Sequence, residues 1–112
     1  MCYMILKDLI ESANDILGLP IDWENHATDD NYRQLFACAK LVLNAVMGMW
    51  TMSDSTRINA SDYNLDNSTL VYGILAEYAF VAGMFNEWKV WQDKYQTGLL
   101  KAKNGRSHII PV

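Results

Sequence analysis

Hydrophobic and polar positions repeat with helical spacing along most of the chain. Between Ile5 and Leu17, apolar residues recur every third or fourth position, and charged and amide side chains occupy the other side. Gly18 and then Pro20 form a helix stop, because glycine accepts a left-handed backbone and proline cannot continue a helix. The pattern predicts a short amphipathic helix over residues 5–17.

A longer helix is predicted from about residue 30 to residue 52, after a connector over residues 20–28. We expect Trp23 of this connector to fold back onto the core. Thr28 or Asp29 is placed to cap the longer helix, because a side-chain oxygen at that position accepts from the first free N–H groups.

The longer helix carries apolar residues on two sides. No charged residue lies between Lys40 and Asp54, so its C-terminal half must be covered by its own domain or by a neighbouring subunit. The second apolar stripe consists of Cys38, Leu41 and Ala45.

Residues 53–67 predict a long polar loop, which could hold a short hairpin. A helix capped by Asn67 or Ser68 should follow over residues 69–85, with Glu77 as its one charge. Such an apolar helix is expected at the centre of a bundle, wrapped by the others.

A final helix is predicted from Asn86, as its cap, to Gly105, with a turn over residues 83–86 before it. The chain of 112 residues then reads as one all-α domain over residues 1–104, a bundle of about four helices, followed by an extended tail over residues 105–112.

The net charge of the chain limits the kinds of molecule that it is expected to bind. Nine basic against thirteen acidic residues give a net charge of −4, which disfavours sequence-independent DNA binding and suits protein partners. The N-terminal residues lack the basic and apolar regions of a secretory signal. The apolar segment over residues 69–85 is short for a membrane span and contains a carboxylate, so no membrane partner is expected.

Few side chains suggest a catalytic or metal-binding role. Asp62, Asn64 and Asp66 match the first ligand positions of an EF-hand loop, but Asn67 and Gly73 stand where the motif needs Gly and Glu. These residues are therefore interpreted as a solvated loop and helix cap, and no metal is expected.

The two histidines, His26 and His108, lack neighbours at metal-ligand spacing and are interpreted as surface residues. Cys38 is interpreted as a buried thiol, because an apolar helix face does not activate a cysteine. Glu77 needs a partner such as Arg33, Lys40, a tyrosine hydroxyl or a tryptophan N–H, and no second titratable group suggests catalysis. The sequence predicts no enzyme activity and no cofactor.

Aromatic residues gather in the last helix. Trp88, Trp91 and Tyr95, together with Trp50 and Trp23, could form either a core or an interface. Thirteen aromatic residues are many for a four-helix domain, so we favour oligomerisation.

Several segments, spread over about residues 4–104, carry a resemblance to a known family. They are Ile16-Leu-Gly-Leu19, Leu43-Asn-Ala-Val-Met-Gly-Met-Trp50, Leu70-Val-Tyr-Gly-Ile-Leu-Ala-Glu-Tyr78, Phe85-Asn-Glu-Trp-Lys-Val-Trp91 and Lys94-Tyr95. With the order of the helices, they resemble the small helical head-to-tail connector proteins of tailed bacteriophages, also called head completion or tail accessory proteins.

The resemblance implies a ring of identical subunits that docks below the portal protein and forms a platform for tail components. The ring would extend the channel through which DNA passes without sequence-specific binding, in the neck of a virion assembled in the host cytoplasm. The C-terminal segment, residues 103–112, would reach toward the portal, where its two isoleucines could join a strand edge of the partner. The residues expected at protein interfaces are Trp50, Tyr72, Glu77, Trp88, Trp91, Tyr95, Ile109 and Ile110.

A different class of function fits the same residues. The chain could be a small helical regulatory or adaptor module that binds one protein partner as a monomer or dimer, without catalysis. The oligomeric state, alone and with portal protein, separates the two hypotheses.

Overall fold

The computed structural model describes residues 4–49 and 51–107. Its helices are α1 (Leu6–Leu17), α2 (Asp30–Met47), α3 (Asn67–Val81) and α4 (Phe85–Ser107), joined by the 3₁₀ segments η1 (Trp23–Thr28) and η2 (Ala60–Tyr63). The two-residue strands β1 (Met4–Ile5) and β2 (Arg57–Ile58) pair antiparallel. The expected fold class, an all-α bundle of about four helices, is confirmed.

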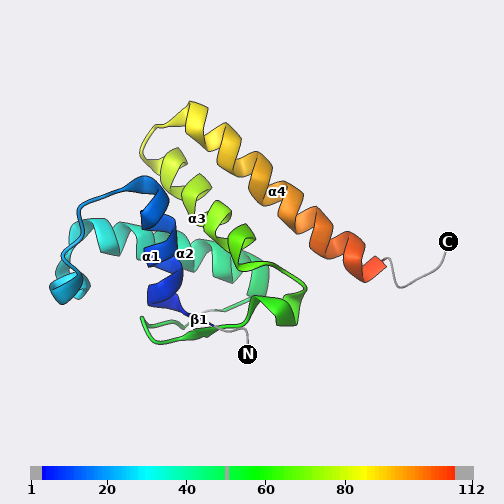
Figure 1. Cartoon of the computed structure of the whole chain (residues 1–112), viewed down its shortest axis with the longest axis horizontal. Helices are drawn as coiled ribbons and strands as arrows, with labels where there is room; N and C mark the ends of the chain where they lie inside the picture. The colour runs from blue at the N-terminus through cyan, green and yellow to red at the C-terminus, as the bar shows by residue number, and fades with distance from the viewer. Residues whose placement is uncertain (1–3, 50, 108–112) are drawn as a thin grey trace.

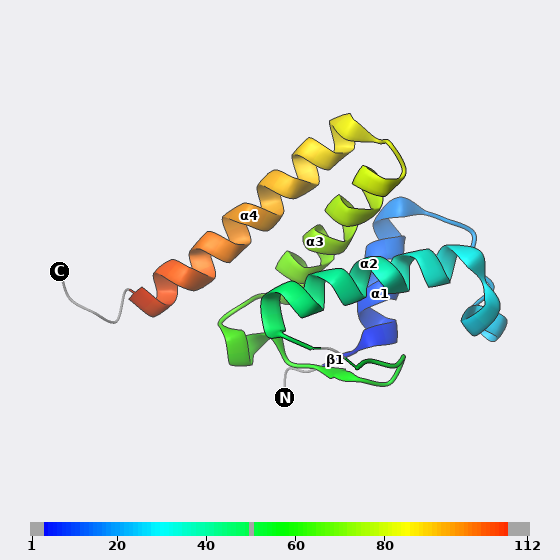
Figure 2. The same ribbon diagram turned by 180° about the vertical axis from the view of Figure 1, so that it is seen from behind.

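The helices pack around α3. Helix α1 crosses α2, and α3 packs against both of them (Figure 1). Helix α4 runs beside α3 on the side away from α1, and its C-terminal part extends beyond the rest of the bundle (Figures 1 and 2). Helix α3 therefore lies between α1 and α4, as expected for the most apolar segment.

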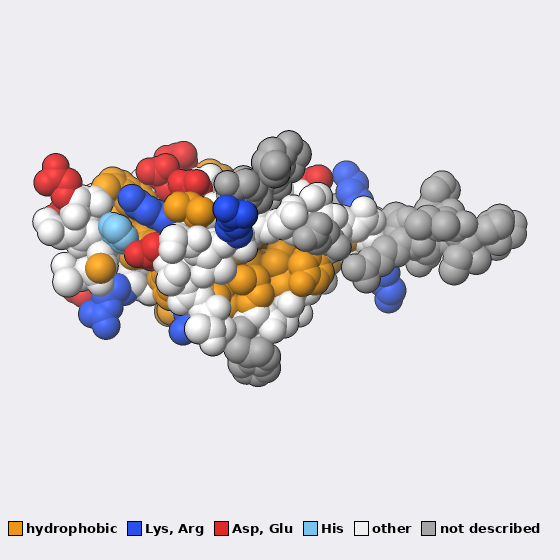
Figure 3. All heavy atoms as spheres, turned by 90° about the horizontal axis from the view of Figure 1, so that it is seen from below, with side chains coloured by type: hydrophobic (Ala, Val, Ile, Leu, Met, Phe, Trp, Pro, Cys, Tyr) orange, Lys and Arg blue, Asp and Glu red, His pale blue; other side chains and the backbone are white. Residues whose placement is uncertain are grey.

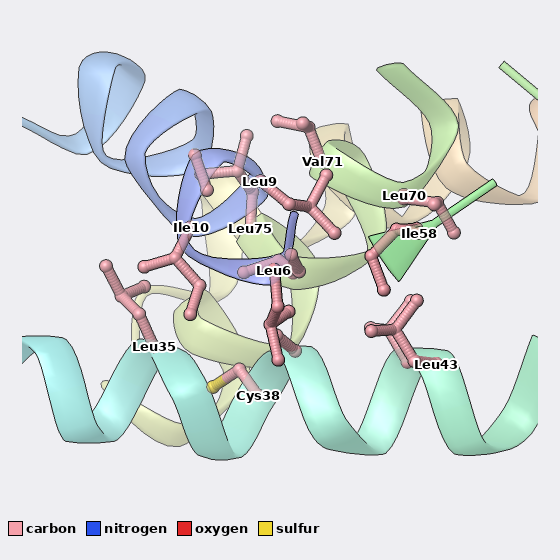
Figure 4. Close-up of a cluster of buried hydrophobic side chains, with 14 of the residues drawn as sticks. Leu6, Leu9, Ile10, Leu35, Cys38, Leu43, Ile58, Leu70, Val71 and Leu75 are labelled. Carbon is pink, nitrogen blue, oxygen red and sulfur yellow. The ribbon is translucent and has the colours of Figure 1, made fainter. Parts of the chain in front are cut away.

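The core is built by α1, α2 and α3 (Figure 4). Leu6, Leu9 and Ile10 of α1 meet Leu35 and Leu43 of α2, and Ile58 of β2 closes one end. Leu70, Ile74 and Leu75 of α3 have no exposed surface at all. Burying a side chain of this size stabilises the fold by about 1.5–3 kcal/mol.

Glycines with positive φ angles end α1 and α2. Gly18 stops α1 as predicted, with a φ of 73°. Gly48, with a φ of 68°, stops α2 at Met47, so the prediction that this helix reaches Met52 was wrong. The apolar pattern continues past Gly48, but a glycine that accepts a left-handed backbone ends the helix first.

The bounds of α3 and α4 also differ from the prediction. Helix α3 begins at Asn67, and its N-cap is Asp66, whose side chain makes no cap hydrogen bond. It ends at Val81 instead of Phe85, because Gly83 turns the chain with a φ of 76° and donates to the carbonyl of Phe80. The expected turn is thus present, but it lies slightly earlier.

Helix α4 begins at Phe85 and continues through Gly105 to Ser107. The prediction that Asn86 caps this helix was therefore wrong. Residues 105–107 are helical and not extended, and the rest of the predicted tail, residues 108–112, lies outside the described residues. A glycine within a helix costs about 1 kcal/mol in propensity, which does not by itself end the helix.

The connector and the polar loop hold more structure than predicted. Trp23 packs against the core as expected, and Asp29 caps α2 by accepting from the Tyr32 N–H at 3.1 Å. The short hairpin that residues 53–67 could hold is absent from the described residues, because β2 pairs with β1 near the start of the chain.

The same loop completes the start of α1. Its carbonyls at Thr56 and Asp54 accept from the N–H groups of Leu6 and Lys7 at 2.9 and 3.0 Å. Since the side chain of Ile5 cannot cap α1, these bonds satisfy donors that would otherwise be unpaired.

Candidate interaction surface on the α3–α4 hairpin

Within the described residues, α4 packs almost entirely on α3, with little contact to α1 or α2. Its inward face is aromatic. The rings of Tyr72 and Trp91 stack with centroids 6.0 Å apart, and Lys94 lies 5.7 Å from the centroid of the Tyr72 ring. Trp91 and Tyr95 are only half-buried, because one neighbouring helix cannot cover their full area.

Two glycines allow the helices of this hairpin to approach closely. A Cβ atom at Gly98 would lie 2.2 Å from Oγ1 of Thr69, and a Cβ atom at Gly73 would lie 2.7 Å from Cε1 of Tyr95. Gly73 also faces Val42 of α2, at 3.1 Å from its Cγ1. The close packing of α3 against α4 therefore requires glycine, which has no Cβ atom, at both positions.

Hydrophobic side chains are exposed where α3 turns into α4. Phe80, Val81 and Phe85 are 56, 60 and 58% exposed. The Phe80 ring lies at the centre of this group. Its centroid is 6.1 Å from that of the Phe85 ring and 5.9 Å from that of the Trp88 ring. We call these four residues the turn patch. Aromatic residues clustered on a surface are typical of protein interfaces.

An open groove runs between the start of α3 and the C-terminal half of α4. Its volume is about 610 Å³. Hydroxyl groups of Ser68, Thr69 and Thr97 line it together with Lys94 and Lys101, and the carboxylates of Asp66 and Asp93 line it too. We call this cavity the α4 groove. A smaller hollow on the other side of α4, of about 390 Å³, is lined by Val46, Tyr63, Leu65, Leu99, Ala102 and Lys103. The view from below shows hydrophobic side chains gathered at the middle of the visible face (Figure 3).

Glu77 lies on α3 between α2 and α4, and it is half-buried. No hydrogen bond or ion pair joins it to another described residue, so none of the described candidates, Arg33, Lys40, the tyrosine hydroxyls or the tryptophan N–H groups, pairs with it. Burial and the charge of Glu77 raise the pKa of the Cys38 thiol to about 11, and the same two causes raise the pKa of Tyr95. Cys38 is a buried free cysteine that stays protonated, which agrees with its interpretation as a core thiol.

The structure brings most of the predicted interface residues together on one hairpin. Tyr72 and Trp91 stack, Tyr95 lies near Glu77, and Trp88 belongs to the turn patch. The three others, Trp50, Ile109 and Ile110, lie outside the described residues.

A polar cluster that the sequence did not predict joins three segments. The Tyr32 hydroxyl of α2 donates to Oδ1 of Asp54 at 2.5 Å, and Nε2 of His26 in η1 lies 2.8 Å from Oδ2. Nδ1 of His26 lies 3.3 Å from the carbonyl oxygen of Trp23. His26 is therefore paired, although we expected an ordinary surface residue. Its partner is distant in sequence, and no motif marks it.

The electrostatics of this cluster favour a charged Asp54. Burial opposes its ionisation, but the hydrogen bonds from Tyr32 and His26 and the charges of His26 and Lys7 outweigh it and lower the pKa of Asp54. Burial, with the hydrogen bond to Asp54 and its charge, raises the pKa of Tyr32. The cluster has a base but no adjacent nucleophile, so its geometry indicates a structural link between η1, α2 and the loop.

The described residues contain no group of three or more His, Cys, Asp or Glu side chains that could hold a metal ion. None of the described helices has the length and apolar character needed to cross a membrane.

Comparison with known proteins adds no relative. The chain matches no protein-family model, no curated protein and no solved structure. The resemblance to phage connector proteins therefore remains a prediction from the sequence.

Proposed function

We propose that this protein is a non-enzymatic assembly subunit, a head-to-tail connector that forms a ring below the portal of a tailed bacteriophage. In this role it extends the DNA channel and offers a platform to tail components. DNA passes through the ring without sequence-specific binding, and the assembled protein lies in the neck of the virion.

The observation that supports this proposal best is the turn patch. Phe80, Val81 and Phe85 expose more than half of their surface, although a bundle with a complete core could have polar residues there. Together with the half-buried aromatic face of α4, they provide a rigid apolar surface on a helical scaffold. A partner that covers such a surface stabilises the complex by roughly 25 cal/mol per Å² of apolar area removed from water.

The test combines this protein with the portal protein encoded in the same genome. Negative-stain electron microscopy and native mass spectrometry should show a ring of this chain on one end of the portal ring. The isolated chain can stay monomeric until the portal is present, so the mixture is the decisive sample. A monomer or dimer that ignores the portal would instead favour the adaptor hypothesis.

A pair of variants connects the assembly to the turn patch. Phe80→Ser with Phe85→Ser should leave the helical content unchanged and abolish the ring on the portal. Ile16→Ser is a matched control, because Ile16 is 50% exposed on α1, outside the turn patch. Loss of the ring in the control alone would contradict the role of the turn patch.

A further inference from the structure

Charge is distributed very unevenly over this protein. Helix α4 carries five basic and two acidic residues, whereas the rest of the chain carries four basic and eleven acidic residues. Seven of these eleven acidic residues lie in α1 or within residues 22–30, toward one end of the longest axis. The C-terminal part of α4 projects toward the other end (Figure 1).

The acidic end includes a regular row of carboxylates on α1. Asp8, Glu11 and Asp15 are all exposed on the side of α1 that faces away from the core. None of them forms an ion pair with another described residue. We call these three residues the α1 acidic stripe. Asp8 and Asp15 are two helical turns apart, which is about 10.5 Å along the axis.

The basic end includes a matching pair of lysines in the α4 groove. Lys94 and Lys101 are also two turns apart, at the same spacing of about 10.5 Å. Both are exposed, and neither forms an ion pair within the described part of the chain. The groove has a polar floor as well, because Thr69 lines it and adds a hydroxyl group. A carboxylate that enters the groove would supply an acceptor for this hydroxyl.

We infer that the α1 acidic stripe of one copy docks in the α4 groove of the next copy. Lys94 and Lys101 match the carboxylates of the stripe in sign and in spacing, although Asp66 and Asp93 make the groove neutral as a whole. They lie on opposite sides of α3, so a subunit cannot satisfy both by folding on itself (Figures 1 and 2). A contact between two different surfaces is heterologous, and it generates a ring when the rotation closes and a filament when it does not.

Two further carboxylates in the groove set the strength of this contact. Asp66 and Asp93 oppose an incoming acidic stripe, and exposed ion pairs contribute only about 0.2–1 kcal/mol each. The contact between two isolated copies is therefore weak and sensitive to salt, and a portal template would strengthen it by holding many copies at once. This inference rests on the proposed function, since it names the surfaces through which the ring would close.

The experiment measures self-association of the purified chain by sedimentation velocity, at about 50 and about 500 mM salt. The wild type should associate at low salt and dissociate at high salt. Lys94→Glu with Lys101→Glu makes the groove acidic, and Asp8→Lys with Asp15→Lys makes the stripe basic. Each double variant alone should associate about tenfold more weakly, because attractions become repulsions. Circular dichroism checks that both variants fold.

Mixing the two double variants gives the decisive result. The acidic groove of one variant now matches the basic stripe of the other, so association should return in the mixture. Lys40→Glu with Lys89→Glu changes the net charge equally outside the groove and should weaken association by less than about threefold, through long-range charge alone. Asp93→Asn should strengthen association, because it removes a carboxylate from the groove.

Three outcomes would overturn the inference: a wild type that stays monomeric at low salt, a mixture that does not associate, or a control as weak as the groove variant. These outcomes are separate from the portal experiment. A ring on the portal that tolerates both charge reversals keeps the proposed function and removes this contact. Charge-dependent self-association without any portal binding keeps this contact and removes the proposed function.

Discussion

Replacing Gly98 with alanine places a methyl group in the closest contact between α3 and α4. The new Cβ atom would lie 2.2 Å from Oγ1, 2.6 Å from Cγ2 and 2.9 Å from Cβ of Thr69. Rotation of the threonine side chain cannot relieve all three contacts, because its Cβ atom is attached directly to the backbone of α3. Helix α4 must therefore move outward, and the stacking of Trp91 on Tyr72 loosens with it.

The expected cost follows from two opposing terms. Alanine is favoured over glycine in a helix by about 1 kcal/mol. Inserting a methyl group into a tight contact costs typically 1–3 kcal/mol, and the overlap here is severe enough for the upper end of that range. The net loss in the free energy of unfolding should be about 2 kcal/mol, which lowers the Tm by roughly 10 °C for a domain of this size.

Urea unfolding followed by far-ultraviolet circular dichroism measures this loss directly. Thr69→Ala combined with Gly98→Ala removes both of the closest threonine atoms but keeps the Cβ atom at 2.9 Å, so the double variant should recover part of the stability lost by Gly98→Ala. Gln96→Ala, at an exposed position of the same helix, is the control for propensity and should change stability by less than about 0.5 kcal/mol. A Gly98→Ala protein at least as stable as the wild type would refute the close α3–α4 contact.

Three further predictions concern other parts of the molecule. Asp54→Asn should reduce stability at neutral pH by about 1 kcal/mol, a modest value because the Asp54 side chain is 38% exposed. Since folding lowers the pKa of Asp54, its contribution is present above the unfolded pKa of about 3.9 and is lost as the pH falls through the folded value. Urea titrations from about pH 3 to pH 7 should therefore show a weaker acid dependence in the variant. Cys38, with a pKa raised to about 11, should react with a disulfide reagent at pH 8 only slowly until urea unfolds the chain; rapid labelling of the native protein would contradict its burial. Trp91→Ala should cost about 2 kcal/mol in urea unfolding, because this ring packs against the core and stacks on Tyr72. Trp88→Ala should cost less than about 1 kcal/mol, because its ring neighbour is the exposed Phe80. Equal losses would contradict the different environments of the two rings.

Local signals in the sequence predicted the helices well, because each depends on a few neighbouring residues. The repeat of apolar residues indicates α1, α2 and α3, and Gly18 ends α1 where the pattern places it. The errors occurred where two local signals compete. At Gly48 the apolar repeat continues while the glycine ends the helix, and at Gly105 the glycine stays within the helix. Contacts with other parts of the folded chain decide which of the two signals prevails, and a sequence pattern does not show these contacts.

The candidate surface was predictable only in part. Helical spacing placed Trp88, Trp91 and Tyr95 toward one side of α4, but not whether that side meets its own chain or a neighbour. The hairpin decides this, because the turn around Gly83 brings Tyr72 beside Trp91 and Thr69 beside Gly98. The turn patch and the α4 groove both result from this pairing.

By itself, the sequence determined an all-α domain with a long polar loop and an apolar central helix, since periodicity and capping act over a few residues. Only the tertiary structure decided that, among the described residues, α4 packs mainly on α3 and leaves aromatic residues exposed at the turn. It also decided that His26 and Tyr32 share Asp54, residues that come from three separate segments. Contacts between distant segments depend on how whole helices pack, and packing is a property of all the side chains together.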